Sequence, residues 1–226
     1  MRRTITVRSE KLYGCLTIQP NLERQEGQFD IQATPKETIL KKTDFLLREM
    51  TEDDLEMVLE WRNLESVRAY MYTDHVISIE EHRSWYAKAK DDPTSVYLVC
   101  EEQGVAIGAV NFVQIDRVNS KSFWGFYLGQ QNGPRGRGSI MEYLALEYAF
   151  GQLELRKLCG EVLSFNEHVL KLHKKFGFQE EGCFRQHVLK NGKYEDVVAI
   201  GLLADEWAGK RDRLGKICFR DKEMNS

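Results

Sequence analysis

The order of strand and helix patterns between residues 45 and 207 limits the possible folds more than any other feature of this sequence. Two hairpin signals, Gln103-Gly104 and Asn191-Gly192, each separate two β-rich segments and favour antiparallel pairing. Between these hairpins the chain alternates strand, helix, strand and helix, which is typical of parallel pairing. The sequence therefore predicts an α/β (α+β) fold with a mixed, mostly antiparallel central sheet of six to seven strands flanked by helices.

End signals mark where individual helices begin and end. Thr51 with Asp54, and Ser78 with Glu81, have the capping-box spacing that begins a helix, and Gly177 follows the last position of another. The spacing of apolar residues then separates helices from strands. We expect helices over residues 55–62, 78–90, 141–149 and 166–176 and after Asp205, and strands over 45–48, 96–100, 105–112, 123–128, 157–163, 181–189 and 195–203.

Composition divides the chain into three parts. Residues 1–43 are polar, rich in Glu, Gln, Lys and Thr, and contain two of the four prolines, so we interpret them as an N-terminal extension. Residues 44–215 carry the element signals and are predicted to form one domain. Residues 216–226 are expected to be a C-terminal tail.

Charge and cysteine usage exclude several classes of protein. A net charge of −3 provides no dominant attraction for nucleic acid or anionic lipid. The five cysteines are scattered and form no CxxC pair, which is typical of a reduced chain without a disulfide framework or a zinc site. We find no apolar run typical of a membrane span or a signal peptide. We therefore expect a cytoplasmic protein with no metal and with neither nucleic-acid nor membrane partners.

The join between the strand over 123–128 and the next helix indicates an anion-binding cradle. A loop rich in Gly and Arg ends at Gly138, where an amphipathic helix begins. Backbone N–H groups at a helix N-terminus bind anions, and glycines let the backbone approach a phosphate closely. Arg135 and Arg137 add positive charge. The loop has no Gly-Lys-Ser/Thr and is therefore not a Walker A motif; a surface loop that uses glycine only for turning is the alternative.

Two motifs in this order resemble the GNAT superfamily of acyl-CoA-dependent N-acyltransferases. The pyrophosphate loop of that family is Arg/Gln-x-x-Gly-x-Gly/Ala, and Arg135 and Gly138 match its first and fourth positions. Ile140 stands at the sixth position, where the family prefers a small residue. The second motif is Asn-x-x-Ala-x-x-Leu-Tyr-x-x-x-Gly-Phe. Four positions match it and two depart from it: Asn166, Leu172, Gly177 and Phe178 match, Val169 replaces the Ala, and His173 replaces the Tyr.

The resemblance covers about residues 45–207 and implies a GNAT fold that uses acetyl-CoA as its co-substrate. The pantetheine would lie along the strand at Tyr127 and Leu128, and Asn166 would contact the pantetheine arm. The pyrophosphate would lie on backbone amides of the loop, with Arg135 beside it. The implied amides are those of Gly136, Arg137, Gly138, Ser139 and Ile140.

The implied reaction is direct attack of a neutral amine on the thioester, and the leaving thiolate needs a proton. His173 occupies the place of the tyrosine that commonly supplies this proton in the family, and it is the candidate acid. Glu161 lies in a strand that is expected to be central, where a carboxylate is costly unless it faces a cavity or a partner. Glu161 is therefore a candidate base or substrate ligand, and Tyr127 would lie where donor and acceptor meet. The alternatives are a packed helix histidine and a strand carboxylate that points to solvent.

The first two helices interleave arginine, aromatic, methionine and histidine side chains, a set that suits a sugar nucleotide. Their pattern resembles a GNAT subgroup that acetylates the 4-amino group of a UDP-linked 4-amino-4,6-dideoxy sugar in pseudaminic acid biosynthesis. On that resemblance the pocket would be lined by Arg62, Met71, Tyr72, His82, Trp85, Phe123 and Glu161.

Three other interpretations stay open at this point. Acidic residues of the same helices, such as Glu60 and Glu80, favour a polyamine acceptor, and a protein N-terminus is a further GNAT acceptor. The departures at His173 and Ile140 also fit a catalytically weakened acyl-CoA-binding module. The sequence leaves the oligomeric state open, with a homodimer as one option.

Overall fold

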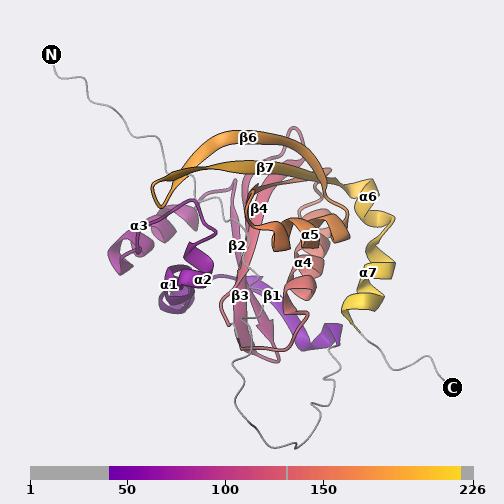
Figure 1. The fold of residues 1–226 in the computed structure, drawn as a ribbon. Coiled ribbons are helices and arrows are strands. Elements are labelled where there is room, and N and C mark those ends of the chain that lie inside the picture. The colour runs from indigo at the N-terminus through magenta and orange to yellow at the C-terminus, as the bar shows by residue number, and fades with distance from the viewer. Residues whose placement is uncertain (1–40, 131, 220–226) are drawn as a thin grey trace, which may run out of the picture.

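The structure is a computed structural model, and it describes residues 41–130 and 132–219 (Figure 1). Its seven strands form one sheet in the order β1-β2-β3-β4-β5-β7-β6. Only β4 and β5 pair in parallel, so the predicted mixed, mostly antiparallel sheet is confirmed. The strands are β1 (Phe45–Glu49), β2 (Val96–Glu102), β3 (Val105–Asp116), β4 (Lys121–Leu128), β5 (Lys157–Leu163), β6 (Gln179–Lys190) and β7 (Lys193–Leu203).

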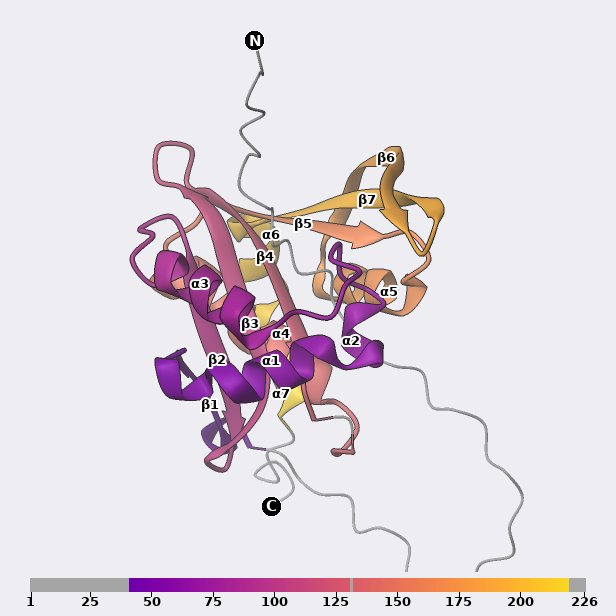
Figure 2. The ribbon, with the colours of Figure 1, turned by 90° about the vertical axis from the view of Figure 1, so that its left-hand side faces the viewer.

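Helices cover both faces of the sheet (Figures 1 and 2). On one face lie α1 (Leu55–Asn63), α2 (Glu65–Arg68) and α3 (Ile79–Ala89). On the other lie α4 (Arg137–Glu147), α5 (Glu167–Phe176), α6 (Ala204–Ala208) and α7 (Arg211–Cys218). Two apolar clusters fill these two spaces: Trp124 and Phe126 of β4 belong to the larger one, and Tyr127 belongs to the smaller one under α1 and α3.

The local end signals have the conformations that the sequence predicts. Gln103, Gly104, Asn191 and Gly192 all have positive φ angles, as a tight hairpin turn requires. Gly177 ends α5 in the left-handed conformation with φ 110°, which costs a glycine little.

The domain boundaries differ in one place from the prediction. Residues 1–40 of the expected extension and residues 220–226 of the expected tail lie outside the described residues. The folded domain continues past residue 215, because α7 runs to Cys218 and buries Phe219 against Phe45 and Tyr143.

The parallel pairing of β4 with β5 is short. Residues 121–123 of β4 pair with residues 157–159 of β5, and no pair follows. β3 stays paired with β4 as far as Leu128, and β7 pairs with β5 along its whole length. Residues 124–128 of β4 therefore have one edge that no strand of this sheet occupies.

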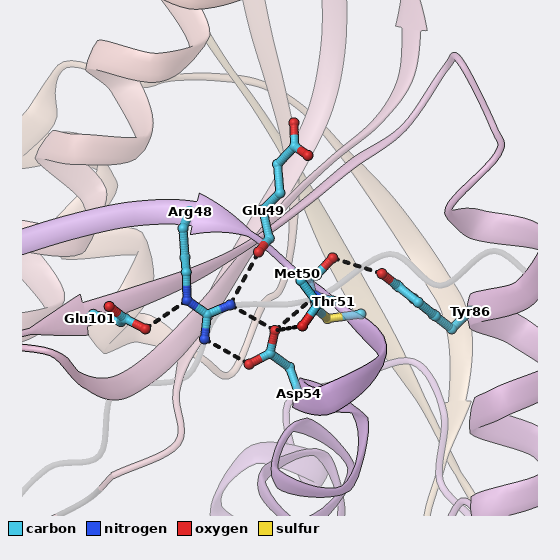
Figure 3. A network of polar contacts seen from close by, with 7 residues as sticks. All are labelled: Arg48, Glu49, Met50, Thr51, Asp54, Tyr86 and Glu101. Atoms are coloured by element: carbon cyan, nitrogen blue, oxygen red, sulfur yellow. Dashed lines mark hydrogen bonds and ion pairs between the residues drawn. The ribbon is translucent and has the colours of Figure 1, made fainter.

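A polar network attaches the helical layer to the sheet edge (Figure 3). Arg48 of β1 donates to both carboxylate oxygens of Asp54 at 2.7 Å and to Glu101 of β2 at 2.6 Å. Tyr86 of α3 donates to the carbonyl of Met50 at 2.7 Å. The network fixes the start of α1 and the end of α3 against β1.

The network predicts a pH-dependent contribution to stability. Hydrogen bonds from Arg48 hold the pKa of Asp54 below its usual value. A carboxyl group with a lowered pKa stabilises the fold above its unfolded pKa of ~3.9 and loses that contribution as the pH falls through its folded pKa. We expect Asp54→Asn to lower the free energy of unfolding by about 2 kcal/mol at neutral pH, measured by urea unfolding.

The difference between this variant and the wild type should shrink below pH ~4. Glu56→Gln is the control, because it removes an exposed ion pair with Arg83 and should change stability by less than about 0.5 kcal/mol. A loss of equal size at neutral and acidic pH would contradict the ionic origin.

Candidate active site

The acceptor side of the site forms where the loop after α2 meets β5. The hydroxyl of Tyr72 donates to Oε2 of Glu161 at 2.8 Å. Phe123 is the last β4 residue that pairs with β5 before the strands separate. The predicted pair Tyr72 and Glu161 is therefore brought together beside the point of separation.

A second group of predicted residues is buried between α1, α3 and β4. Arg62 is 8% exposed, and its Nη1 forms no hydrogen bond with any described residue. Burial lowers the pKa of Arg62, and the only group that opposes this is the phenol of Tyr127. No carboxylate of the described chain pairs with this guanidinium, which makes the position an electrostatic site for an anion.

His82 and Trp85 extend this group along α3. Their rings stack at 5.0 Å between centroids, and Nε2 of His82 has no hydrogen-bond partner among the described residues. Burial, and then the charge of Arg62, lowers the pKa of His82 to about 4. Burial likewise raises the pKa of Tyr127 to about 12. His82 and Tyr127 are therefore neutral at physiological pH, and Arg62 carries the charge of this group.

Met71 is predicted to line the substrate pocket, and the structure places its side chain in the interior. Its side chain is fully buried in the smaller apolar cluster, so in this structure it supports the loop by packing and offers no surface to a substrate.

The Gly- and Arg-rich loop leads into α4 at Gly136, which has φ 100°. The first turn of a helix leaves its N–H groups without helical acceptors, and here these belong to Arg137, Gly138 and Ser139. The amide of Ile140 is also predicted to hold the pyrophosphate. In the structure it already donates to the Gly136 carbonyl at 3.0 Å. Of the five predicted amides, that of Ile140 is therefore already used within the helix.

The two arginines of this loop have different surroundings. The guanidinium of Arg137 is mostly buried and is bound by Glu102 of β2, with Nε 2.6 Å from Oε2. The predicted charge of Arg137 is therefore already neutralised, whereas Arg135 is exposed beside the helix start. After the end of β5, Asn166 is buried at the N-cap position of α5, where its carbonyl accepts from the amide of Leu170.

The predicted acid, His173, lies in the interior and has a partner that the sequence analysis did not select. Nδ1 of His173 lies 2.7 Å from Oε1 of Glu142 on α4, and both side chains are fully buried. Burial raises the pKa of Glu142, and the histidine opposes this rise. The sequence feature that singles out Glu142 is its position as the one acidic residue within the apolar run 140–146.

The second nitrogen of His173 is buried near Trp124, the first β4 residue beyond the pairs with β5. Nε2 of His173 and Nε1 of Trp124 both lack hydrogen-bond partners among the described residues, and their rings lie 5.5 Å apart. A Cβ placed on Gly160 of β5 would lie 3.6 Å from Nε1 of Trp124. The indole and the imidazole therefore stand side by side at the separated strands.

The described residues contain neither a metal-binding cluster nor a membrane-spanning helix. Within residues 41–130 and 132–219, no three His, Cys, Asp or Glu side chains lie together as a metal site would require. Over the same residues, no helix has both the length and the apolar character needed to cross a membrane.

Comparison with known proteins decides the family. The family model of the Acetyltransferase (GNAT) domain matches residues 44–179, which is more than half of the chain. The chain belongs to the GNAT family. It is an N-acetyltransferase of the GNAT type, a family that uses acetyl-CoA, and the seven-stranded mixed sheet is the GNAT fold.

Similar GNAT proteins carry different names. Spermidine N(1)-acetyltransferase of Escherichia coli (strain K12) is 25% identical over 174 residues, which cover 77% of this chain and 94% of that protein. Acetyltransferase PseH of Campylobacter jejuni is 27% identical over 130 residues, covering 58% of this chain and 80% of PseH. A crystal structure of Vibrio cholerae spermidine N-acetyltransferase with CoA and spermine has a TM-score of 0.70 at 24% identity, covering 74% of this chain and 99% of that one. These similarities leave the acceptor open.

The buried state of His82 predicts how stability depends on pH. An imidazole in the unfolded chain has a pKa of ~6.5, so as the pH falls the unfolded state binds this proton first. The native GNAT domain should therefore lose stability between pH ~6.5 and the folded pKa of about 4.

His82→Asn should flatten this part of the curve in urea unfolding. The matched control is His168→Asn, because His168 is an exposed histidine of α5 and its replacement should leave the wild-type slope. A wild-type slope in His82→Asn would show that another group is responsible.

Proposed function

We propose that the protein transfers the acetyl group of acetyl-CoA to the 4-amino group of a UDP-linked 4-amino-4,6-dideoxy sugar. The observation that carries this proposal is the buried guanidinium of Arg62, which has no carboxylate partner in the described chain. A buried cation is costly unless an anion joins it, and a diphosphate supplies one. The similarity to PseH, the enzyme type whose helix pattern this chain resembles, supports the same acceptor.

A polyamine is the competing acceptor, because spermidine acetyltransferases are as similar to this chain as PseH is. Spermidine is a cation, and placing it beside the unpaired charge of Arg62 would add repulsion at a desolvated site. The electrostatics near Arg62 therefore favour a nucleotide sugar over a polyamine.

The site would hold the two ends of such a sugar nucleotide by different chemistry. Arg62 would bind the diphosphate, with His82 beside it, and aromatic faces such as Trp85 and Phe123 would pack on the base and the sugar. Glu161 would bind the amino group and accept its proton, since only the neutral amine attacks a thioester. The hydroxyl of Tyr72 already orients that carboxylate.

Acetyl-CoA would bind along the free edge of β4. Among the described residues, no strand pairs with the backbone from residue 124 to Leu128 on this side, so its polar groups would be available to the pantetheine amides. The amides of Arg137, Gly138 and Ser139 would hold the pyrophosphate, with exposed Arg135 adding charge. Asn166 would lie beside the pantetheine arm from the opposite strand.

His173 would protonate the thiolate that leaves when the amide bond forms. Glu142 binds Nδ1, which fixes the ring and leaves Nε2 as the nitrogen that can donate. Tyr127 would meet the thioester from the other face of β4. The protons balance when the ammonium gives one proton to Glu161 before attack and its second N–H proton, lost as the amide forms, replaces the proton that His173 gives to the thiolate.

The acid role predicts a selective loss of turnover. His173→Ala should lower kcat by about 10²- to 10⁴-fold, while calorimetry shows acetyl-CoA binding close to wild type. Glu142→Gln keeps the shape of the buried pair and should lower kcat without raising the KM for acetyl-CoA. The exposed His168→Ala is the control, and wild-type kcat in folded His173→Ala would disprove the role.

The acceptor is tested by thiol release from acetyl-CoA with the UDP-4-amino-4,6-dideoxy sugar and spermidine offered separately. We expect release with the sugar, and release with spermidine alone would overturn the proposed acceptor. Arg62→Gln should raise the KM of the sugar by about tenfold to a hundredfold, since it removes a charged hydrogen bond. The control Arg83→Gln changes an exposed arginine of α3 and should leave this KM unchanged.

A further inference from the structure

Lys190 is a buried lysine whose ammonium faces a loop from a distant part of the chain. It is the last residue of β6, and only 4% of it is exposed. Nζ donates to the carbonyl of Met71 at 2.7 Å and to that of Arg68 at 3.0 Å. It also lies 2.5 Å from Oδ1 of Asp74. A single ammonium thus joins the tip of the β6–β7 hairpin to the chain that follows α2.

That chain is residues 69–78, which we call the acceptor loop. It links α2 to α3 and contains neither helix nor strand. Besides the contact with Lys190, Tyr72 of this loop donates to Glu161, and the ring of Tyr70 lies 5.8 Å from that of Phe165. The loop reaches from the helical layer to β5 and to the hairpin tip, as both views of the ribbon show (Figures 1 and 2).

Because the acceptor loop has no regular hydrogen-bond ladder, its position depends on individual attachments, which also include two hydrogen bonds between Asn63 and Ile77 and the burial of Met71. The hairpin contributes two of them, since the amide of Asn191 also donates to Oδ2 of Asp74 at 3.1 Å. A buried ammonium requires such acceptors, and removing it takes a donor from the carbonyls of Met71 and Arg68, of which Arg68 keeps the amide of Met71 at 3.1 Å. The side chain of Asp74 is 39% exposed, so this carboxylate is less buried than the ammonium.

We propose that Lys190 is a positioning residue for the acceptor: it clamps the acceptor loop so that Tyr72 holds Glu161 ready for the amine. The inference rests on the proposed function for the role of Glu161. It predicts that changes at the hairpin tip weaken binding of the acceptor and leave binding of acetyl-CoA, which would lie along β4, unchanged.

The test compares Lys190→Met with wild type in the thiol-release assay. Methionine keeps the buried apolar stem and removes the charge. We expect the acceptor KM to rise about tenfold or more, with the KM for acetyl-CoA within about twofold of wild type. Tyr72→Phe should raise the same KM, and the double variant should show less than the product of the two effects, because both act through one loop.

Lys193→Met is the matched control. Lys193 lies on the same hairpin, but it is exposed and pairs only with Glu195 among the described residues. It should leave both KM values unchanged. If Lys190→Met fails to fold, Asp74→Asn removes the carboxylate and keeps the carbonyl contacts, and it should produce a smaller change of the same kind.

The failure of the clamp and the failure of the proposed acceptor have different signatures. If spermidine alone releases thiol, the proposed sugar acceptor is wrong. The clamp is then tested by comparing the KM for spermidine of Lys190→Met with that of wild type. Hydrogen exchange of ligand-free protein gives an independent measurement, in which Lys190→Met should accelerate residues 69–78 and leave β2 and β3 protected. Unchanged exchange of residues 69–78, or an equal rise in both KM values, would overturn the clamp.

Discussion

The parting of β4 and β5 after three residue pairs is the constraint on which the rest of the site depends. β5 stays with β7 to its end, while β4 stays with β3, so within the described part of the chain no strand pairs with one side of β4 from residue 124. Unpaired strand edges require a partner, and an extended amide-bearing arm is a suitable one. The helices α4 and α5 follow these two strands in the chain, after residues 129–136 and residues 164–166 respectively.

Local signals in the sequence predicted the fold well because each depends on residues a few positions apart. The turn at Asn191-Gly192, the end of α5 at Gly177 and the capping box of Thr51 are settled by backbone conformation and by neighbours in the chain. The resemblance to GNAT motifs also predicted a loop that leads into a helix at Gly136 and a helix that contains His173, and the structure has both elements. What it could not provide was the state of each side chain.

Side-chain states were missed where the deciding partner is far along the chain. Arg137 is neutralised by Glu102, which is 35 residues away, and His173 is held by Glu142, which is 31 residues away. Lys190 meets Met71 across 119 residues. Such pairs follow from how β2, α4 and the hairpin tip come together in space, and no spacing rule for a single helix or strand contains that information. Met71 was misplaced for the same reason, since its burial depends on the packing of α1 and α3 against β3 and β4.

The buried polar atoms without partners indicate where the fold has been shaped for a ligand. Leaving such an atom unpaired costs about 1–3 kcal/mol, so folded proteins keep few of them. Here Nη1 of Arg62 and Nε2 of His82 lie on the acceptor side of the sheet, while Nε1 of Trp124 and Nε2 of His173 lie on the other side, where β4 leaves β5. Two substrates that approach the separated strands from opposite faces would satisfy both groups, and direct transfer between two bound substrates requires that arrangement. On the proposed function, these four atoms, which have no hydrogen-bond partner among the described residues, would find their partners in the two substrates.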